Sequence, residues 1–179
     1  PNITLSVVIA ADGLLHRPDL SAEEKSLQLF LQLAGRAGRA NKKGKVIFQT
    51  YKPSHPVIAY LQKRDYEGFL TETSKLRKNA NLFPYCRICL LKLSGENYEL
   101  TELIAIKIAN YLLNFCKKNH WKLIGPAPSL IAKVGKKFRW QILIHGPEGS
   151  HIPLPERSLL WKLIPKNVFL TIDVNPAEL

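Results

Sequence analysis

Two short β-rich apolar segments, residues 3–10 and 45–51, flank one helical pattern, and this arrangement constrains the fold of the chain most strongly. The first segment, ITLSVVIA, ends just before Asp12-Gly13, a pair that is typical of a turn. The second segment, KVIFQTY, is followed by a pattern that predicts a short helix over 55–64. Strand, helix, strand and helix in this order predict α/β organisation with a parallel sheet.

The helix between these two strands is expected to begin at Ser21. The residues Ser21-Ala-Glu-Glu24 match a capping box, in which the serine hydroxyl and the glutamate carboxylate each accept a hydrogen bond from the other's backbone N–H. Apolar residues then follow at helical spacing. Those expected to face a core are Leu27, Phe30, Leu31 and Ala34.

The remainder of the chain, 65–179, has a different pattern. A charged helical segment over 65–79 leads into strands and helices in the order β-α-β-β-α-β. The expected strands are 87–93, 121–124, 138–145 and 167–174, and the expected helices are 99–119 and 155–163. This order predicts an α+β domain of the ferredoxin-like kind, and we place the domain boundary between residues 64 and 65.

The charge of the chain indicates which class of partner it binds. Twenty-six Lys and Arg residues against 14 Asp and Glu residues leave a net charge of +12 in 179 residues. The excess is shared equally, because residues 1–64 hold ten basic and four acidic residues (+6) and residues 65–179 hold sixteen and ten (+6). Such an excess favours a polyanionic partner. The candidate polyanions are DNA, RNA and an acidic membrane. No apolar run approaches the roughly 20 residues that a membrane helix needs, so we expect no membrane-spanning segment.

The cysteines do not predict a metal site. Cys86 and Cys89 form a CxxC, which occurs in half-sites for zinc and in redox pairs. They also lie within a strand-like run, in which residues three apart point to opposite faces and cannot share a metal. The three cysteines include no second CxxC, and the five histidines are scattered. We therefore expect no metal ligands in this chain.

The sequence contains no methionine and begins at Pro1. An unprocessed translation product begins with methionine. We therefore expect either that processing removed an N-terminus or that the chain is a fragment of a longer protein.

The segment QxxGRxGR is the most specific indication of chemical function in the sequence. On a helix, Gln32, Arg36 and Arg39 stand on one face, and two guanidinium groups on one stripe suit a polyphosphate. Gly35 and Gly38 remove side chains beside the arginines, which lets a second surface approach closely. An arginine near a γ-phosphate stabilises charge that develops during hydrolysis. The alternative is an ordinary amphipathic helix with two solvated arginines.

This motif resembles the last signature motif of superfamily 2 helicases and translocases, and its surroundings resemble the primosomal protein N′ family of replication-restart DNA helicases. The second resemblance extends over essentially the whole chain, and its match after residue 50 argues against a branch-migration helicase. It is carried by Asn2–Leu5, Ala11-Asp12, Pro18–Leu20, Leu29–Gln32, Gln49–Tyr51, His55–Ile58, Asp65–Glu67, Pro84-Tyr85, Leu123–Pro128, Arg139–Gln141 and Ile172–Pro176.

The resemblance implies roles for both parts of the chain. Residues 1–64 would be the C-terminal part of the second, RecA-like helicase lobe, and residues 65–179 a C-terminal domain that binds branched DNA and the single-strand-binding protein. Arg39 would be the arginine finger on the γ-phosphate of ATP, with Arg36 beside it and Gln32 on nucleotide or water. The complete enzyme would unwind DNA 3′ to 5′ at stalled forks, assemble the primosome with its partner proteins and work in the cytoplasm.

Several parts of such a motor are not in this sequence. It has no GxxxxGK[ST] phosphate loop and no acidic Mg²⁺-binding box, so ATP and Mg²⁺ would be shared with a lobe outside this chain. The zinc-binding cysteines of the family precede this region, and Cys86 and Cys89 do not match them. We therefore expect no ATP hydrolysis by this chain alone. The alternative function is a non-catalytic nucleic-acid-binding module that retains a helicase-like helix.

A second basic site is expected near residue 136. Its cationic residues, with Phe138 and Trp140 interleaved, are Lys133, Lys136, Lys137 and Arg139. Cations next to aromatic rings suit phosphate contact combined with base stacking. Phe138 and Trp140 share one face of the expected strand, and Arg139 takes the other. The alternative is that the two rings belong to the core and the lysines only decorate a hairpin.

Overall fold

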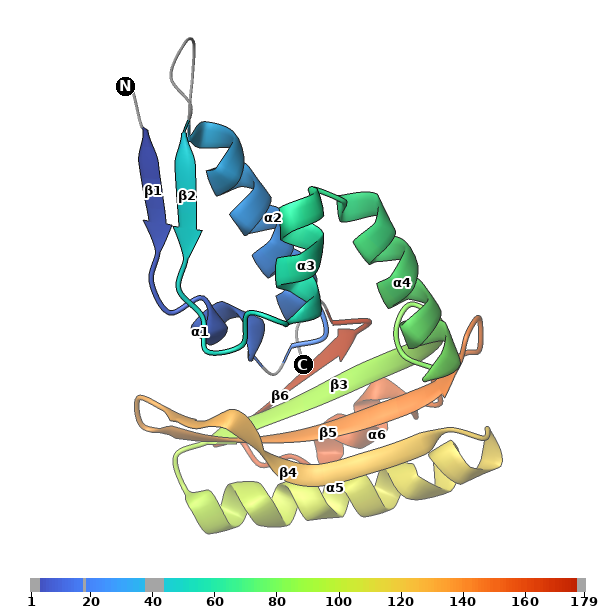
Figure 1. The fold of residues 1–179 in the computed structure, drawn as a ribbon. Helices are drawn as coiled ribbons and strands as arrows, with labels where there is room; N and C mark the ends of the chain where they lie inside the picture. Colours follow the sequence, from blue (N-terminus) through green and yellow to red (C-terminus); the bar gives the residue numbers. More distant parts are fainter. Residues whose placement is uncertain (1–3, 18, 38–43, 177–179) are drawn as a thin grey trace. The chain divides into compact units, whose positions relative to one another are not determined.

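The computed structural model describes residues 4–17, 19–37 and 44–176, which form two compact units (Figure 1). One unit reaches to Leu76, and the other runs from Arg77 to Pro176. Together they are a mixed α/β structure that contains a parallel strand pair and a four-stranded antiparallel sheet. No described helix is long and apolar enough to cross a membrane.

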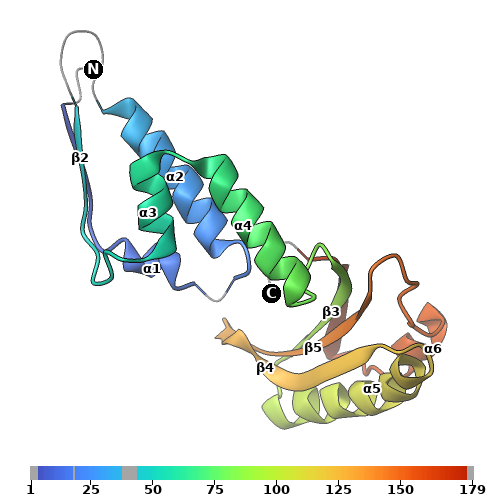
Figure 2. The same cartoon turned by 45° about the vertical axis from the view of Figure 1, so that its right-hand side comes forward.

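The first unit is built around two parallel strands. Its elements are β1 (Leu5–Val8), α1 (Asp12–Leu15), α2 (Ala22–Arg36), β2 (Lys45–Phe48), α3 (Pro56–Lys63) and the first part of α4 (Tyr66–Asn79). Leu5 pairs with Lys45 and Val8 pairs with Phe48, so the predicted parallel pairing is confirmed. Helices α2 and α3 lie on the same side of the strands (Figure 2). The core between them is made by Ala11, Leu15, Leu27, Phe30, Val57, Ile58, Leu61 and Phe69.

The other side of the strand pair is open among the described residues. The side chains of Leu5, Val7, Ile9 and Ile47 are all exposed. Parallel strands are normally covered on both faces, and a sheet of two strands is marginal without further packing. The described part of this unit therefore presents an apolar sheet face that its own residues do not cover.

The start of α2 differs from the predicted capping box. Ser21 occupies the N-cap position, but its hydroxyl makes no capping bond to the helix. It donates to Asp19 Oδ1 at 3.0 Å instead, and Lys25 Nζ lies 3.0 Å from Asp19 Oδ2. The backbone N–H of Ser21, which a capping box pairs with Glu24, also donates to Asp19 Oδ1 at 3.1 Å. The backbone of Ser21 has ψ 5° rather than the extended conformation that is typical of a capping serine. The expected core residues Leu27 and Phe30 are fully buried.

Helix α4 contains the division between the two units. Near its start, Phe69 packs edge-to-face against Tyr60 of α3, with ring centroids 5.6 Å apart. The hydroxyl of Tyr60 also donates to Glu72 Oε2. These contacts tie the first half of α4 to the first unit. The compact units accordingly divide between Leu76 and Arg77, whereas the sequence placed the boundary between residues 64 and 65.

The second unit follows the β-α-β-β-α-β order that the sequence predicted. Its elements are β3 (Cys86–Gly95), α5 (Tyr98–Lys118), β4 (Lys122–Val134), β5 (Lys137–Pro147), α6 (Arg157–Lys162) and β6 (Val168–Val174). The strand order is β4-β5-β3-β6 with antiparallel pairing throughout, so β3 and β5 are central. This arrangement is compatible with a ferredoxin-like sandwich.

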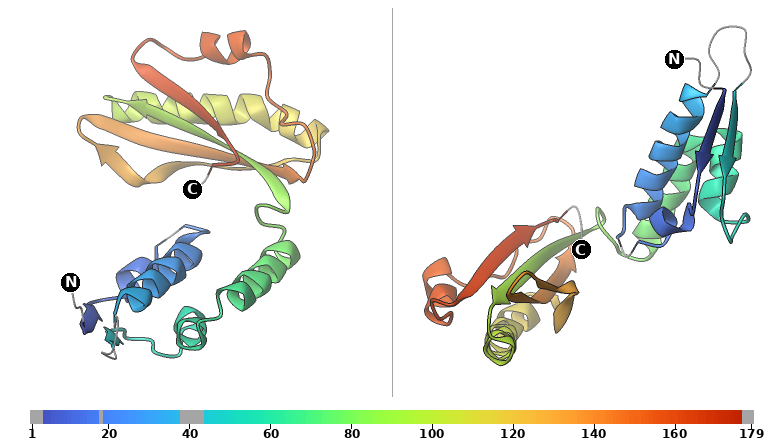
Figure 3. Two further views of the ribbon diagram at one scale, coloured as in Figure 1. Left: turned by 90° about the horizontal axis from the view of Figure 1, so that it is seen from above. Right: turned by 90° about the vertical axis from the view of Figure 1, so that its left-hand side faces the viewer.

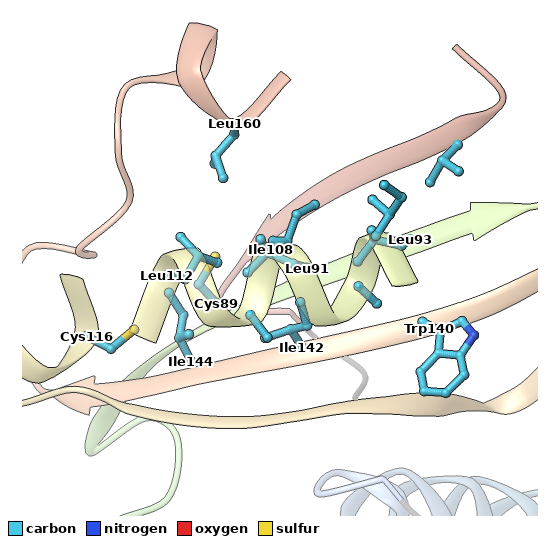
Figure 4. Packing of buried hydrophobic residues seen from close by; sticks show 14 of the residues in the cluster. Cys89, Leu91, Leu93, Ile108, Leu112, Cys116, Trp140, Ile142, Ile144 and Leu160 are labelled. Atoms are coloured by element: carbon cyan, nitrogen blue, oxygen red, sulfur yellow. The ribbon is translucent and has the colours of Figure 1, made fainter. Parts of the chain in front are cut away.

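Alternate residues of the central strands face α5, which runs across one face of this sheet (Figure 3). On β3 these are Cys89, Leu91 and Leu93, and all three are buried. Their partners on β5 are Ile144, Ile142 and Trp140. The same buried cluster includes residues of both helices, among them Ile108, Leu112 and Cys116 of α5 and Leu160 of α6 (Figure 4). The intervening residues of β3 and β5 point to the opposite face, because side chains alternate along a strand.

Strand β4 is longer than the sequence predicted. The expected strand, 121–124, continues through Gly125 to Val134, with register shifts after Ile124 and after Pro128. Gly125 has φ +100°, and a Cβ at this position would lie 2.9 Å from the carbonyl oxygen of Gln141. Glycine allows both the left-handed backbone and the close approach of β5. With these register shifts, β4 stays paired with β5 as far as the turn that joins the two strands.

Candidate functional site

The described part of QxxGRxGR forms the carboxyl end of α2. Gln32 and Arg36 are four residues apart on this helix, slightly more than one turn, so they share a face. Both are exposed. Gly35 lies between them, and a Cβ added there would meet nothing within 4 Å. The structure thus brings Gln32, Gly35 and Arg36 together on open helix surface. Gly38 and Arg39 lie outside the described residues.

The position of Arg36 relative to the strands is distinctive. Figure 1 shows the end of α2 beside the start of β2. In open α/β sheets, ligands usually bind at the carboxyl ends of the strands instead. Arg36, the last residue of α2, therefore lies at the opposite edge of the strand pair. A phosphate that it contacts has to be carried by a surface that approaches this edge.

The carboxyl ends of β1 and β2 carry a polar cluster that the sequence analysis missed. Thr50 Oγ1 donates to Asp12 Oδ1 at 2.8 Å, and the backbone N–H of Tyr51 donates to Asp12 Oδ2 at 3.1 Å. Burial alone would raise the pKa of Asp12, but these hydrogen bonds outweigh it and hold the pKa below the ordinary value. The sequence signal is an acidic residue two positions after the expected strand 3–10, and the pair Asp12-Gly13 predicts a turn there without predicting the contact with Thr50.

The basic hairpin, which we define as residues 133–139, joins β4 to β5. Val134 pairs with Lys137 across a turn at Gly135 and Lys136, and Gly135 has φ +59°. Lys133, Lys136 and Lys137 are exposed, and Arg139 is half-buried. The four predicted cations are therefore brought together at one end of the sheet, where they can reach phosphate groups.

Two lysines of the basic hairpin, Lys133 and Lys137, lie over aromatic rings on different strands. Lys133 Nζ is 4.8 Å from the ring centroid of Phe138. Lys137 Nζ is 4.0 Å from the ring centroid of Phe169 on β6. Distances of this size allow cation–π attraction, which holds the flexible lysine stems in place.

The rings of Phe138 and Trp140 are not available in the way that base stacking requires. Both contact Tyr98 at the start of α5, with centroid distances of 5.4 and 5.8 Å. Trp140 belongs to the buried cluster beneath α5, and Phe138 is half-buried at its edge. These two aromatics accordingly pack with the core, as the alternative interpretation of the sequence predicted.

Phe169 is the aromatic residue that the sequence analysis overlooked. It lies on β6, where Ser94 is its partner on β3, and 54% of its surface is exposed. Its neighbours Val168 and Leu170 are buried and half-buried. The segment NVFLTIDV predicted a strand, but only the register shows that Phe169 lies on the face opposite α5.

The cysteines are buried in the second unit. Cys86 and Cys89 lie on β3, Cys116 lies on α5, and all three are free thiols. Burial raises the pKa of Cys89 to about 11, and the carboxylate of Asp173 and the thiol of Cys116 add to the effect. Within the described ranges, no three His, Cys, Asp or Glu side chains are grouped as a metal site would require.

Comparison with known proteins gives one consistent result. A family model described as the primosomal protein N C-terminal domain matches residues 78–177. Proteins named replication restart protein PriA are 36% identical over 178 residues in Synechocystis sp., 34% over 181 residues in Haemophilus influenzae and 36% over 180 residues in Bacillus subtilis. These matches cover 99, 100 and 98% of this chain but only 21, 25 and 22% of those proteins. The chain therefore spans a quarter or less of the length of these relatives.

Proposed function

Because the chain belongs to the primosomal protein N C-terminal domain family, we propose that it is the C-terminal part of a replication-restart protein. The complete protein is an ATP-dependent 3′–5′ DNA helicase that recognises stalled or branched replication forks and assembles the primosome. The observation that carries this proposal is the match of the family model to 78–177 combined with full coverage of this chain by replication restart proteins. The chain contributes two cationic surfaces to that function.

The first surface is the end of α2. We propose that residues 1–64 belong to a RecA-like lobe, whose further strands and helices cover the open face made by Leu5, Val7 and Ile47. The parallel pairing of β1 with β2 and the exposure of that face support this assignment. In the complete lobe, the apolar side chains that are exposed on this face become part of a continuous core.

In the complete protein, ATP and Mg²⁺ are held mainly by the other helicase lobe and supply the phosphoryl chemistry. The exposed side chains of Gln32 and Arg36 and the open surface at Gly35 fit this task, because they leave room for a nucleotide-bearing surface. Arg36 and Arg39 neutralise negative charge on the terminal phosphate, and Gln32 orients nucleotide or water. The zinc of the family is bound by cysteines in the upstream region.

The second surface is the basic hairpin. Lys133, Lys136, Lys137 and Arg139 bind the phosphates of forked DNA, and their grouping at one end of the sheet supports this role. The single-strand-binding protein and other primosome proteins are the protein partners. We further propose that the protein works in the cytoplasm.

Binding of a fluorescein-labelled forked DNA by the 179-residue chain tests this proposal. We expect binding that weakens steeply as salt rises, because each phosphate contact releases counterions. Absence of binding at low salt, with a folded protein, would contradict the role of the second surface.

A further inference from the structure

The sheet of the second unit has a face opposite α5 that is polar and basic near the basic hairpin. The strand register places Arg139 of β5, Ser94 of β3 and Phe169 of β6 in one row across this face. Their strand neighbours Trp140 and Leu93 are buried on the side of α5, so this row points away from the helix. Neighbouring strands are about 4.8 Å apart, so the row spans roughly 10 Å.

The next row on the same face is also polar. It consists of Gln141, Lys92 and Thr171 on β5, β3 and β6. Lys92 Nζ lies 3.8 Å from Asp173 Oδ2, and both side chains are partly exposed. Hydroxyl, amide and ammonium groups thus follow the first row over three adjacent strands. Such groups can donate to and accept from base edges.

Phe169 is the apolar member of these two rows and lies against a cation, whereas the next row on the same face begins with Leu143 and Leu90. Its ring is half exposed, and Lys137 Nζ stands 4.0 Å from the ring centroid. A solitary exposed aromatic residue needs no explanation by itself. Here, however, the ring lies on the same face as Lys92 and Arg139, and Asp173 is the one carboxylate on β3, β5 and β6. The face therefore combines a ring with an excess of positive charge.

We propose, building on the DNA binding argued above, that this face binds single-stranded DNA with Phe169 as its stacking platform. Lys137 moves from the face of the Phe169 ring to a phosphate, Arg139 contacts a second phosphate, and one base stacks on the ring face that Lys137 leaves. Unpaired bases present their faces and edges to such a sheet, as they do on other four-stranded sheets that bind single strands. The bases of a duplex are already stacked on one another, so a duplex gains only the phosphate contacts.

Fluorescence anisotropy with labelled dT20 and a labelled 20-bp duplex tests the proposal on the 179-residue chain. Phe169→Ala should weaken binding of dT20 by about 5-fold or more, the value of one lost stacking contact, and leave duplex binding within about twofold. The salt dependence should be unchanged, because the ring carries no charge. Leu103→Ala is the matched control, since Leu103 is exposed on α5, which covers the other face of the sheet.

Two further variants distinguish the effect of the aromatic ring of Phe169 from the effect of its size. Phe169→Tyr retains an aromatic face and should bind dT20 like the unchanged chain. Phe169→Leu retains an apolar side chain without a ring and should bind like Phe169→Ala. The thermal transition of each variant, followed by circular dichroism, identifies any loss of fold, and the tyrosine and leucine variants decide the matter if the alanine variant unfolds.

The outcomes distinguish this proposal from the one on which it rests. If the unchanged chain binds neither probe, the proposed DNA binding itself fails. If the chain binds DNA but Phe169→Ala and Phe169→Leu leave dT20 binding unchanged, or weaken both probes equally, the stacking face is overturned and DNA binding stands. Tighter binding of rU20 than of dT20 would assign the face to RNA and would also overturn the proposal.

Discussion

The ammonium nitrogen of Lys137 lies 4.0 Å from the ring centroid of Phe169, which joins the tip of the basic hairpin to the edge strand β6. The two residues are far apart in the sequence, and β5 and β6 are both neighbours of β3 rather than of each other. The contact therefore depends on the register of three strands. It places a phosphate-binding cation directly beside an exposed ring.

Removal of two hairpin lysines tests the electrostatic part of this surface. Lys136→Ala/Lys137→Ala in the 179-residue chain should weaken binding of dT20 and reduce the slope of log K against log salt by about 1.4, since each phosphate contact contributes about 0.7 with single strands. Titrations between about 50 and 200 mM salt measure this slope. Lys117→Ala/Lys118→Ala removes the same charge at the end of α5 and should change the slope little. Equal changes in the two variants would mean that only net charge matters.

The thiols should be unreactive in the folded protein. The pKa of Cys89 is raised to about 11 by burial, with contributions from Asp173 and Cys116, so its reactive thiolate is scarce near pH 8. A colorimetric thiol reagent should find all three cysteines protected until the protein is denatured with guanidinium chloride. The stabilisation from keeping Cys89 neutral is complete below about pH 9 and is lost as the pH rises through about 11. Rapid labelling of the folded chain near pH 8 would contradict the burial of these residues.

Asp12 should stabilise the first unit through its ionised form. Its folded pKa is lower than its ordinary value of 3.8, so the stabilisation is present above that value and is lost as the pH falls through the folded pKa. Thr50→Val removes the hydroxyl that donates to Asp12 and should raise the pKa of this carboxyl, measured by its ¹³C chemical shift during an acid titration. Asp12→Asn should weaken the dependence of the melting temperature on pH below about pH 5. An unchanged Asp12 titration in Thr50→Val would exclude the hydroxyl as a cause.

Gly146 should be essential for the packing of the second unit. A Cβ on this residue of β5 would collide with the ring of Trp121, which is buried. Gly146→Ala should therefore lower the free energy of unfolding by about 1–3 kcal/mol, as overpacking of a core does. Chemical denaturation measures this change. Gly13→Ala in α1 is the control, because a Cβ there meets nothing within 4 Å, and it should leave stability unchanged or raise it by up to about 1 kcal/mol.

The order and type of the elements could be predicted from the sequence because apolar periodicity encodes them locally. The strand at residues 3–10, the helix after Ser21 and the β-α-β-β-α-β order were all visible in this way. The predicted cap at Ser21 was wrong because Asp19 accepts from both the backbone N–H and the hydroxyl of Ser21. The capping-box pattern does not include the residue two positions upstream, so it could not predict this competition with Glu24 for the Ser21 N–H.

The candidate sites, too, could be predicted only where their residues lie close together in the sequence. The grouping of Lys133, Lys136 and Lys137 follows from their closeness in sequence, so the pattern sufficed. The role of Phe169 could not be found in this way, because its relation to Lys137 depends on how β5, β3 and β6 align. The cluster of Asp12 with Thr50 likewise depends on the parallel pairing of β1 and β2.

ATP hydrolysis by the complete protein, stimulated by forked DNA, is the most direct test of whether the end of α2 belongs to the ATP site. We predict that Arg36→Ala/Arg39→Ala lowers the rate about a thousandfold or more, the effect of losing an arginine finger, while DNA binding remains. Arg17→Ala, which removes another exposed arginine of the same unit, should leave the rate unchanged. A double variant that hydrolyses ATP at the full rate would contradict the assignment of this helix to the ATP site.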